Sequence, residues 1–383
     1  MSSSSSPPSS SMILSLRTSH LIACSFDRWY PRFRTSPKDK HTFESRVIEL
    51  EDRFIDFLKQ DGIRLPRPPK DPQLLKGRDP RKPPKGNDDD SWAGDDDDDN
   101  DEGASLEPFE GLERSIEEAV EELGGEVFPK LNWSSPRDAA WMGGGTLACG
   151  TPGEVFLLLK SSDFCQSDVR SSEQSSVRPA LVLRKYLELN PSLEFRCFVR
   201  GGKLRFACQR DPSRFHPFLN EPEMKQKIAR LLDEFIERIV VPRFDSQGAS
   251  GFVADVYVEM TARRPNGKCW LMDLAPLPEL SSNSEEVSET EIRSSEDILA
   301  TPPHPLLTWE RLFSLEPVQL IDQLLVVTNR NLTDVSEQKV LAMHRVPLDL
   351  VHGALTSETF EEGFNKLRDS QRRGGNSQDD SDD

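Results

Sequence analysis

The stretch Phe128-Pro129-Lys130-Leu131-Asn132-Trp133-Ser134-Ser135-Pro136-Arg137-Asp138-Ala139-Ala140-Trp141 is the most informative part of this chain. It places Lys130 at the end of an apolar segment, which we expect to be a strand over 126–131, and follows it with a polar turn rich in Ser and Pro. A strand that presents a lysine beside such a loop is one way to hold nucleotide phosphates, because Lys acts on phosphate as a point charge. The alternative is that Lys130 is a surface lysine at a strand end.

The composition indicates a folded core interrupted by segments that do not fold. Of the 383 residues, 35% are hydrophobic and 30% are charged, a balance that favours a globular core with disordered inserts. The net charge of −18 argues against broad binding to nucleic acid or to an anionic membrane and favours basic partners.

The six cysteines include no CxxC pair, so we expect a reduced protein without a zinc knuckle or redox motif. With no apolar run near the roughly 18 residues of a membrane span, we expect it to be soluble and cytoplasmic.

Charge runs and Pro-rich stretches divide the chain into successive segments. The prediction is a disordered leader over 1–21, an N-terminal segment packing on the core over 22–63, a disordered Pro-rich and acidic insert over 64–105, the body over 106–280, a disordered acidic insert over 281–305, the C-terminal part of the body over 306–367 and a disordered tail over 368–383. Proline prevents regular structure in the first insert and like-charge repulsion prevents its collapse. The leader shares its Ser-rich composition with transit peptides but lacks an Arg-rich amphipathic helix, so a plain disordered leader or a start at Met12 is favoured.

Hydrophobic periodicity predicts a mixture of helices and hairpins. The expected helices cover 47–60, 112–123, 154–160 and 223–240, the polar stretch 163–177 is expected to be a loop, and strands are expected over 180–183, 252–258 and 269–274. Because the elements show no regular βαβ repeat, the fold class predicted is α+β.

The clearest hairpin surrounds Gly201-Gly202, a two-residue turn that supplies positive φ angles. Its strands cover 194–200 and 203–209. We expect one apolar face in which Phe195, Cys197 and Val199 stand opposite Cys208, Phe206 and Leu204. The other face carries Glu194 and Arg196 and is strongly charged for a sheet, so it should meet solvent or an anionic ligand.

Two basic positions are candidates for nucleotide contacts. The guanidinium of Arg196 can bind phosphate through two parallel hydrogen bonds, although a charge pair with Glu194 or across the strands is an equal alternative. The run Arg184-Lys185-Tyr186-Leu187 ends an apolar strand, where backbone groups could meet an adenine edge and Tyr186 could stack beside it.

Asp255 and Asp273 are each an acid within an otherwise apolar strand. If they lie opposite each other, both carboxylates project from one sheet face at cross-strand distance. A divalent cation would relieve the repulsion, and Mg²⁺ characteristically binds one or two carboxylates together with nucleotide phosphates. The alternative is that each carboxylate pairs separately with an Arg or Lys. The sequence contains no HExxH, GxSxG or P-loop pattern that would support another enzyme class.

The opening stretch resembles the signature of the cell division cycle protein 123 family. The resemblance extends over about 22–367 and includes Leu183-Arg184-Lys185-Tyr186, Glu194-Phe195-Arg196-Cys197-Phe198-Val199, Gln209-Arg210-Asp211 and Leu307-Thr308-Trp309-Glu310. It implies an ATP-grasp-like fold, with two lobes and antiparallel sheets around a nucleotide cleft. It further implies an assembly chaperone that binds the gamma subunit of eukaryotic translation initiation factor 2 and promotes its joining to the alpha subunit.

The resemblance also implies roles for particular residues. Lys130 and Arg196 match phosphate-binding positions, Arg184, Lys185, Tyr186 and Leu187 match the adenine hinge, Glu194 joins the cofactor-binding candidates, and Asp255 and Asp273 match the ligands of Mg²⁺ with ATP. One departure is Ala275, which stands where the family typically has Asn and offers no side-chain oxygen to a cation. An ATP-grasp ligase and a diverged scaffold with weakened ATP use are the alternatives.

Overall fold

The structure is a computed structural model that describes only part of the chain. The described residues are 13–36, 38–60, 62, 108–143, 145–212, 214–261, 263–277, 279–281, 291–292 and 325–328. The predicted insert over 64–105, the tail over 368–383 and most of the segment 306–367 therefore lie outside the described residues.

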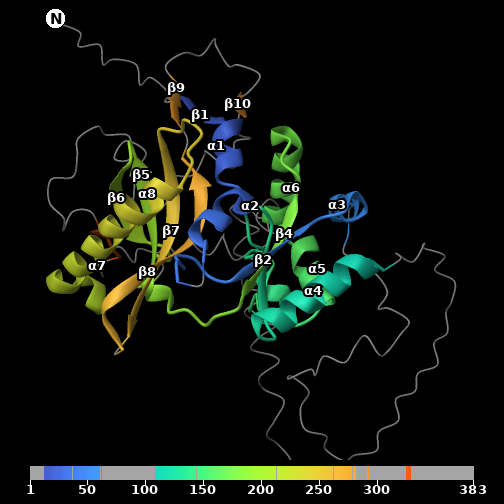
Figure 1. Cartoon of the computed structure of the whole chain (residues 1–383), viewed down its shortest axis with the longest axis horizontal. Coiled ribbons are helices and arrows are strands. Elements are labelled where there is room, and N and C mark those ends of the chain that lie inside the picture. The colour runs from blue at the N-terminus through green and yellow to red at the C-terminus, as the bar shows by residue number, and fades with distance from the viewer. Residues whose placement is uncertain are drawn as a thin grey trace, which may run out of the picture.

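The larger of two main sheets has five strands in the order β11-β6-β5-β7-β8. Its strands are β5 Glu194–Arg200, β6 Lys203–Gln209, β7 Gly251–Thr261, β8 Arg264–Pro276 and β11 Leu325–Val326. All neighbouring pairs are antiparallel except β11 with β6. Helix α7, Pro222–Phe235, covers one face, continues as a π-helical turn over Ile236–Val240 and ends in α8, Val241–Arg243 (Figure 1). The helix predicted over 223–240 is thus confirmed, with π geometry in its last turn.

The smaller main sheet has three antiparallel strands in the order β2-β4-β3. It consists of β2 Ser45–Glu49, β4 Ala180–Lys185 and β3 Val127–Lys130. The helices around it are α3 Asp52–Lys59, α4 Glu110–Leu123, α5 Pro152–Lys160 and α6 Asp163–Ser175 (Figure 1). Apolar side chains of these helices and of β4 form a core separate from that of the five-stranded sheet. Short 3₁₀ turns lie at Tyr30–Phe33, Ala140–Gly143, Pro191–Leu193 and Pro217–Asn220.

Two helical regions differ from the sequence prediction: one predicted helix is shorter than expected, and one predicted loop is a helix. The helix expected over 47–60 is strand β2 followed by α3, because the β-branched Val47 and Ile48 pair with β4 before the helix begins. The loop expected over 163–177 is α6, whose N-terminus is capped by the Ser162 side chain. Cys165, Asp168, Val169 and Ser172 form its buried side, an arrangement that its polar composition concealed.

The register of the β5–β6 hairpin also differs from the prediction. Val199 pairs with Leu204 as expected, but a β-bulge follows and Phe198 then pairs with Phe206. The extra residue shifts the remaining pairs by one, so that Phe195 stands opposite Gln209 and not Cys208. The expected pairing across this hairpin is therefore wrong beyond the turn.

The N-terminal segment lies between the two main sheets. It consists of β1 Ile13–Arg17, α1 Thr18–Ala23 and α2 Phe26–Trp29 (Figure 1). Phe26, Trp29 and Phe33 are fully buried and join the core of the five-stranded sheet. β1 pairs with β9, Glu279–Ser281, and with β10, Glu291–Ile292. The first described strand, which starts at Ile13, therefore falls within the predicted leader, and β10 falls within the predicted insert over 281–305.

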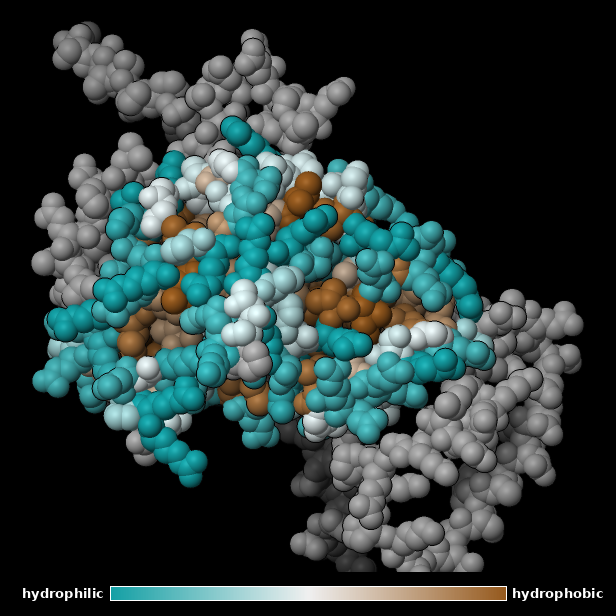
Figure 2. Space-filling model, in the orientation of Figure 1, coloured by the Kyte–Doolittle hydropathy of each residue, from teal (hydrophilic) through white to brown (hydrophobic). Residues whose placement is uncertain are grey.

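One face of the described part is mostly hydrophilic (Figure 2). Figure 2 shows hydrophilic residues over most of one face, with hydrophobic ones visible in the recesses between helices. Among the described residues, no helix combines the length and the apolar character needed to cross a membrane.

Candidate functional site

The loop after β3 is held in place by a buried carboxylate of α6. Asp168 accepts hydrogen bonds from the backbone N–H groups of Trp133, at 3.0 Å, and Ser134, at 2.7 Å, and from the Ser134 hydroxyl at 2.7 Å. Burial raises the pKa of Asp168 to about 6, although these hydrogen bonds oppose the shift. The sequence interpretation missed Asp168 because it placed this residue in a loop.

Asn132 connects the same loop to two other parts of the fold. Its side-chain oxygen accepts from the Ala180 N–H at 2.7 Å, and its amide nitrogen donates to the Ser25 hydroxyl at 3.0 Å and to the Arg178 carbonyl at 3.2 Å. Since Asn132 is buried, these bonds fix the loop against β4 and the start of α2.

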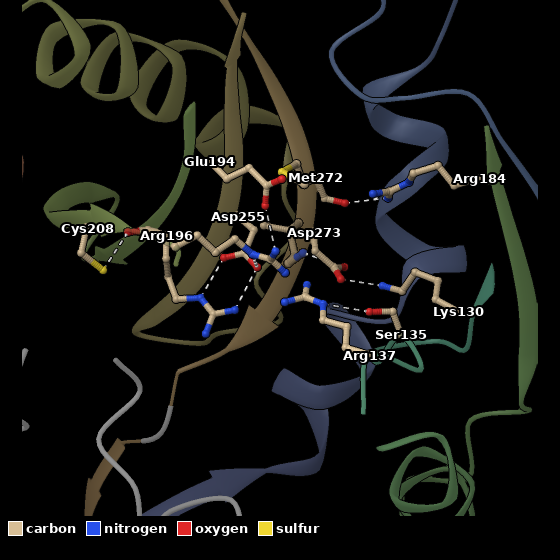
Figure 3. A network of polar contacts seen from close by, with 12 residues as sticks. Lys130, Ser135, Arg137, Arg184, Glu194, Arg196, Cys208, Asp255, Met272 and Asp273 are labelled. Atoms are coloured by element: carbon tan, nitrogen blue, oxygen red, sulfur yellow. Dashed lines mark hydrogen bonds and ion pairs between the residues drawn. The ribbon is translucent and has the colours of Figure 1, made fainter. Parts of the chain in front are cut away.

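Asp255 and Asp273 are direct partners across β7 and β8, as predicted (Figure 3). Each of the two carboxylates forms an ion pair with a different basic side chain. Asp273 lies 2.6 Å from the Lys130 ammonium, and Asp255 accepts two hydrogen bonds from Arg196, at 2.8 and 2.9 Å. Separate ion pairs, the alternative to metal binding, are therefore present in this structure, and a metal-binding role for the two carboxylates stays a prediction.

A second arginine, Arg210, was not singled out from the sequence. Its Nε lies 2.8 Å from Asp255 Oδ2, and its Nη1 lies 2.9 Å from Glu194 Oε2. Burial would raise the pKa of Asp255, but Arg196 and Arg210 together hold it well below its usual value. Burial, followed by the charges of Asp255 and Asp211, raises the pKa of Glu194 to about 7. Glu194 thus pairs with Arg210, whereas the sequence suggested Arg196 as its alternative partner.

Lys130 is buried, so its interpretation as a surface lysine is wrong. Its side chain is 1% exposed, and its ammonium lies 5.2 Å from the centre of the Phe26 ring. Burial lowers the pKa of Lys130, and the Asp273 carboxylate opposes this effect. The lysine is therefore a desolvated cation held between a carboxylate and an aromatic ring.

A cleft with a volume of about 180 Å³ lies between the five-stranded sheet and the loop after β3. Its lining consists of Trp133, Ser134, Ser135, Arg137, Phe164, Arg196, Val253, Asp255, Asp273 and Ala275. Arg137 donates to the Ser135 hydroxyl at 3.1 Å, and no carboxylate of the described residues forms an ion pair with it. Both predicted aspartates and one predicted arginine thus meet the polar loop here, and Arg137 adds a cation that the sequence interpretation did not single out.

The predicted adenine hinge lies apart from this lining. The Arg184 guanidinium is 5.3 Å from the Phe26 ring and 6.0 Å from the Phe43 ring, and it donates to the Met272 carbonyl at 2.6 Å (Figure 3). Arg184 therefore connects β4 to β8. Its Nε is buried without a partner among the described residues.

The other three hinge residues lie at the end of β4 away from Lys130. The backbone N–H groups of Lys185 and Tyr186 already donate to carbonyls of Glu44 and Glu126, at 2.9 and 3.1 Å. Leu187 is 42% exposed. Two of the amides expected to meet an adenine edge are thus engaged within the protein.

Within the described ranges, no three His, Cys, Asp or Glu side chains come together in a group that could hold a metal ion. A cation in the cleft could bind to the two aspartates and to oxygens of a ligand. Mg²⁺ is commonly bound in this way, through one or two carboxylates plus phosphates.

Fold and site together define an α+β protein with two sheets, each with its own core, and a cleft lined by carboxylates and cations. The family model D123 matches residues 29–354. The chain therefore belongs to the D123 family, which confirms the resemblance found in its sequence.

Curated relatives and a solved structure agree with this assignment. The chain is similar to the "Translation initiation factor eIF2 assembly protein" of Ajellomyces capsulatus, with 35% identity over 298 residues, covering 68% of this chain and 64% of the relative. It is also similar to the "Cell division cycle protein 123" of Phaeosphaeria nodorum, with 39% identity over 261 residues, covering 64% and 62%. The match thus spans slightly less than two thirds of these relatives. The structure of Cdc123 from Schizosaccharomyces pombe matches with a TM-score of 0.50 and 29% identity, covering 69% of this chain and 87% of that one, which confirms the predicted fold class.

Proposed function

We propose that this protein binds ATP with Mg²⁺ and acts as an assembly chaperone for eukaryotic translation initiation factor 2. The name of the relatives in Ajellomyces capsulatus, Aspergillus fumigatus and Emericella nidulans, translation initiation factor eIF2 assembly protein, supports the assembly role. The nucleotide role rests on one observation: Asp255 and Asp273 face each other at a cleft that also presents Arg196 and Arg137. Carboxylates for a cation beside guanidinium groups for phosphates are the donor set that a metal–triphosphate complex requires.

The residues present fit such a ligand. Asp255 and Asp273 would hold the cation, and Lys130, Arg196 and Arg137 would contact phosphate oxygens. When bound, Mg²⁺ would neutralise part of the triphosphate charge and replace Lys130 and Arg196 as counter-ions of the two carboxylates. The two basic side chains could then turn to the phosphates, so ligand binding would exchange one set of ion pairs for another.

The adenine contact is proposed at the carbonyls of Lys185 and Tyr186 and the backbone of Leu187, since the first two amides are engaged. The Tyr186 and Thr146 hydroxyls are 3.4 Å apart, which fixes the Tyr186 ring close to the loop after β3. The ring could then pack beside the base.

The proposed partner is the gamma subunit of the initiation factor, and the proposed compartment is the cytoplasm. The net charge of −18 suits a partner surface rich in Lys and Arg. Ala275 in the cleft lining favours one competing proposal, a diverged scaffold with weakened metal binding, because its methyl group cannot coordinate a cation.

Calorimetry with ATP, in Mg²⁺ and in EDTA, tests the nucleotide part of the proposal. We expect binding that is stronger with the metal in the wild type and no longer metal-dependent in Asp273→Asn. A wild type that binds no ATP would contradict this part and favour the scaffold.

Capture of the isolated gamma subunit tests the chaperone part. No capture, together with ADP release that depends on an added amine or acid, would favour a ligase.

A further inference from the structure

Arg210 occupies a position behind the proposed metal site. It follows β6 directly, and its backbone N–H donates to the Glu194 carbonyl at 2.9 Å, which fixes the start of its side chain against β5. The side chain is 13% exposed. Among the described residues, Arg210 is not part of the cleft lining, whereas Asp255 and Arg196 are. Arg210 therefore contacts the carboxylate without contacting the space where a ligand would bind.

The guanidinium of Arg210 joins two carboxylates. Its Nε donates to Asp255 and its Nη1 to Glu194, at 2.8 and 2.9 Å. Because the guanidinium is planar, contacts at both ends fix its orientation as well as its position. With both carboxylates ionised, the four side chains Glu194, Arg196, Arg210 and Asp255 carry two positive and two negative charges.

The two oxygens of Asp255 are not equivalent in this network. Oδ2 accepts from both Arg196 and Arg210, whereas Oδ1 accepts from Arg196 and from no other residue in the described part of the chain. A carboxylate oxygen has two acceptor sites, so Oδ2 is fully used and Oδ1 is not. If Arg196 leaves for a phosphate, Oδ1 becomes free while Oδ2 keeps its bond to Arg210.

We infer that Arg210 is a positioning residue for the proposed metal site: it holds the Asp255 carboxylate in a fixed orientation, with Oδ1 available to the cation, while Arg196 exchanges the carboxylate for a phosphate. This inference rests on the proposed function. The Asp255 side chain is 6% exposed, and a buried carboxylate that lost both arginines would be strongly destabilised. Arg210 prevents this destabilisation, because it stays bound to Asp255 when Arg196 moves to the phosphate.

The test is calorimetry of the full chain with ATP, in Mg²⁺ and in EDTA. Arg210→Gln should weaken binding in Mg²⁺ by about 10- to 100-fold, as is usual for partners of metal ligands, and change binding in EDTA much less. In the Asp255→Asn background, Arg210→Gln should cause no further loss in Mg²⁺, since both changes act through the same carboxylate. Arg210→Lys keeps the charge but not the planar fork, and should fall between wild type and Arg210→Gln.

Arg205→Gln is the matched control. Arg205 also lies on β6, and its Nε donates to the Arg200 carbonyl at 3.2 Å, so the variant should leave both affinities unchanged. Equal losses in Mg²⁺ and EDTA, or losses that add to those of Asp255→Asn, would overturn the inference and show a purely structural salt bridge. A wild type that binds no ATP would instead overturn the proposed function, and this inference with it.

Circular dichroism shows whether each variant folds. If Arg210→Gln does not, Glu194→Gln tests the same idea, because it removes the charge that anchors the second arm of Arg210 and retains an oxygen acceptor. We then expect a smaller loss, confined to the measurement in Mg²⁺. No loss, or the same loss in EDTA, would overturn the positioning role.

Discussion

The Lys130 ammonium lies 2.6 Å from the Asp273 carboxylate and connects the strand before the polar loop to the last long strand of the other sheet. The lysine is buried and the aspartate is 24% exposed. Separating the pair would therefore leave the lysine without a counter-ion or water, whereas water could replace the lysine at the aspartate. The aspartate can be hydrated in place, but the lysine cannot. This difference makes the pair suited to an exchange in which the carboxylate meets a new cation from the cleft and the lysine meets a phosphate oxygen in place of the carboxylate, without becoming hydrated.

Removing the lysine should destabilise the fold. We expect Lys130→Met to lower the free energy of unfolding by about 1–3 kcal/mol, less than for a fully buried pair because Asp273 reaches solvent. Urea denaturation measures this change. Lys59→Met is the control, since the Lys59–Glu173 pair lies on the surface, and it should have little effect. Equal effects of the two substitutions would contradict a structural role for Lys130.

The buried carboxylate of Asp168 predicts a pH dependence of stability. Its pKa is raised from 3.8 to about 6 in the folded protein, so between these values the folded state binds a proton that the unfolded state has released. The stability of the wild type relative to Asp168→Asn should therefore fall as pH rises from 4 to 6, by up to about 3 kcal/mol, and then level off. Urea denaturation of both proteins at pH 4, 5, 6 and 7 checks this. A constant difference would contradict the raised pKa.

Ala275 provides a gain-of-function prediction. Ala275→Asn would add an oxygen at the cleft, and we expect the affinity for Mg²⁺ in the presence of ATP to rise about fivefold, the equivalent of about 1 kcal/mol for one added polar contact. Ala275→Leu, which has a similar shape and no oxygen, serves as the control. Calorimetric titration of Mg²⁺ into the ATP-saturated protein measures both. An equal response to Asn and Leu would exclude coordination at this position.

Replacing Asn132 should lower the free energy of unfolding substantially, because its buried side chain makes several hydrogen bonds at once. Asn132→Ala would leave the buried Ala180 N–H without an acceptor, and we expect a loss of about 2–4 kcal/mol of unfolding free energy. Asn220→Ala removes bonds to the Thr328 carbonyl, at 3.0 Å, and to the His216 carbonyl, at 3.5 Å, but Asn220 is exposed, so the substitution should cost much less. Chemical denaturation distinguishes the two. A small effect of Asn132→Ala would show that the loop does not depend on this side chain.

The sequence predicted best where the pattern was local and strong. Asp255 and Asp273, each a single acid in an apolar strand, were predicted to lie opposite each other, and this pairing of β7 with β8 is confirmed. The hairpin was recognised from Gly201-Gly202, but its register depended on a bulge that no residue in the turn signals. Helix α6 was missed because three of its five buried residues are Asp or Ser, which polar patterning assigns to solvent.

The counter-ions of the site could not be predicted in the same way. Arg210 reaches Asp255 only because β6 and β7 lie on either side of β5, an arrangement fixed by sheet order and not by spacing along the chain. The same holds for Asp168, which lies 34 positions from the residue it holds. Such partners become visible only when the strands and helices are assembled.

The position of Phe26 has a consequence for biosynthesis. This ring lies beneath both Lys130 and Arg184, and its neighbours in the core include side chains of the last long strand, β8. Contacts between residues so far apart in sequence are slow to form and cannot form during synthesis until the later strand has left the ribosome. The aromatic segment around Phe26 therefore lacks part of its core partners in the nascent chain until β8 has been translated.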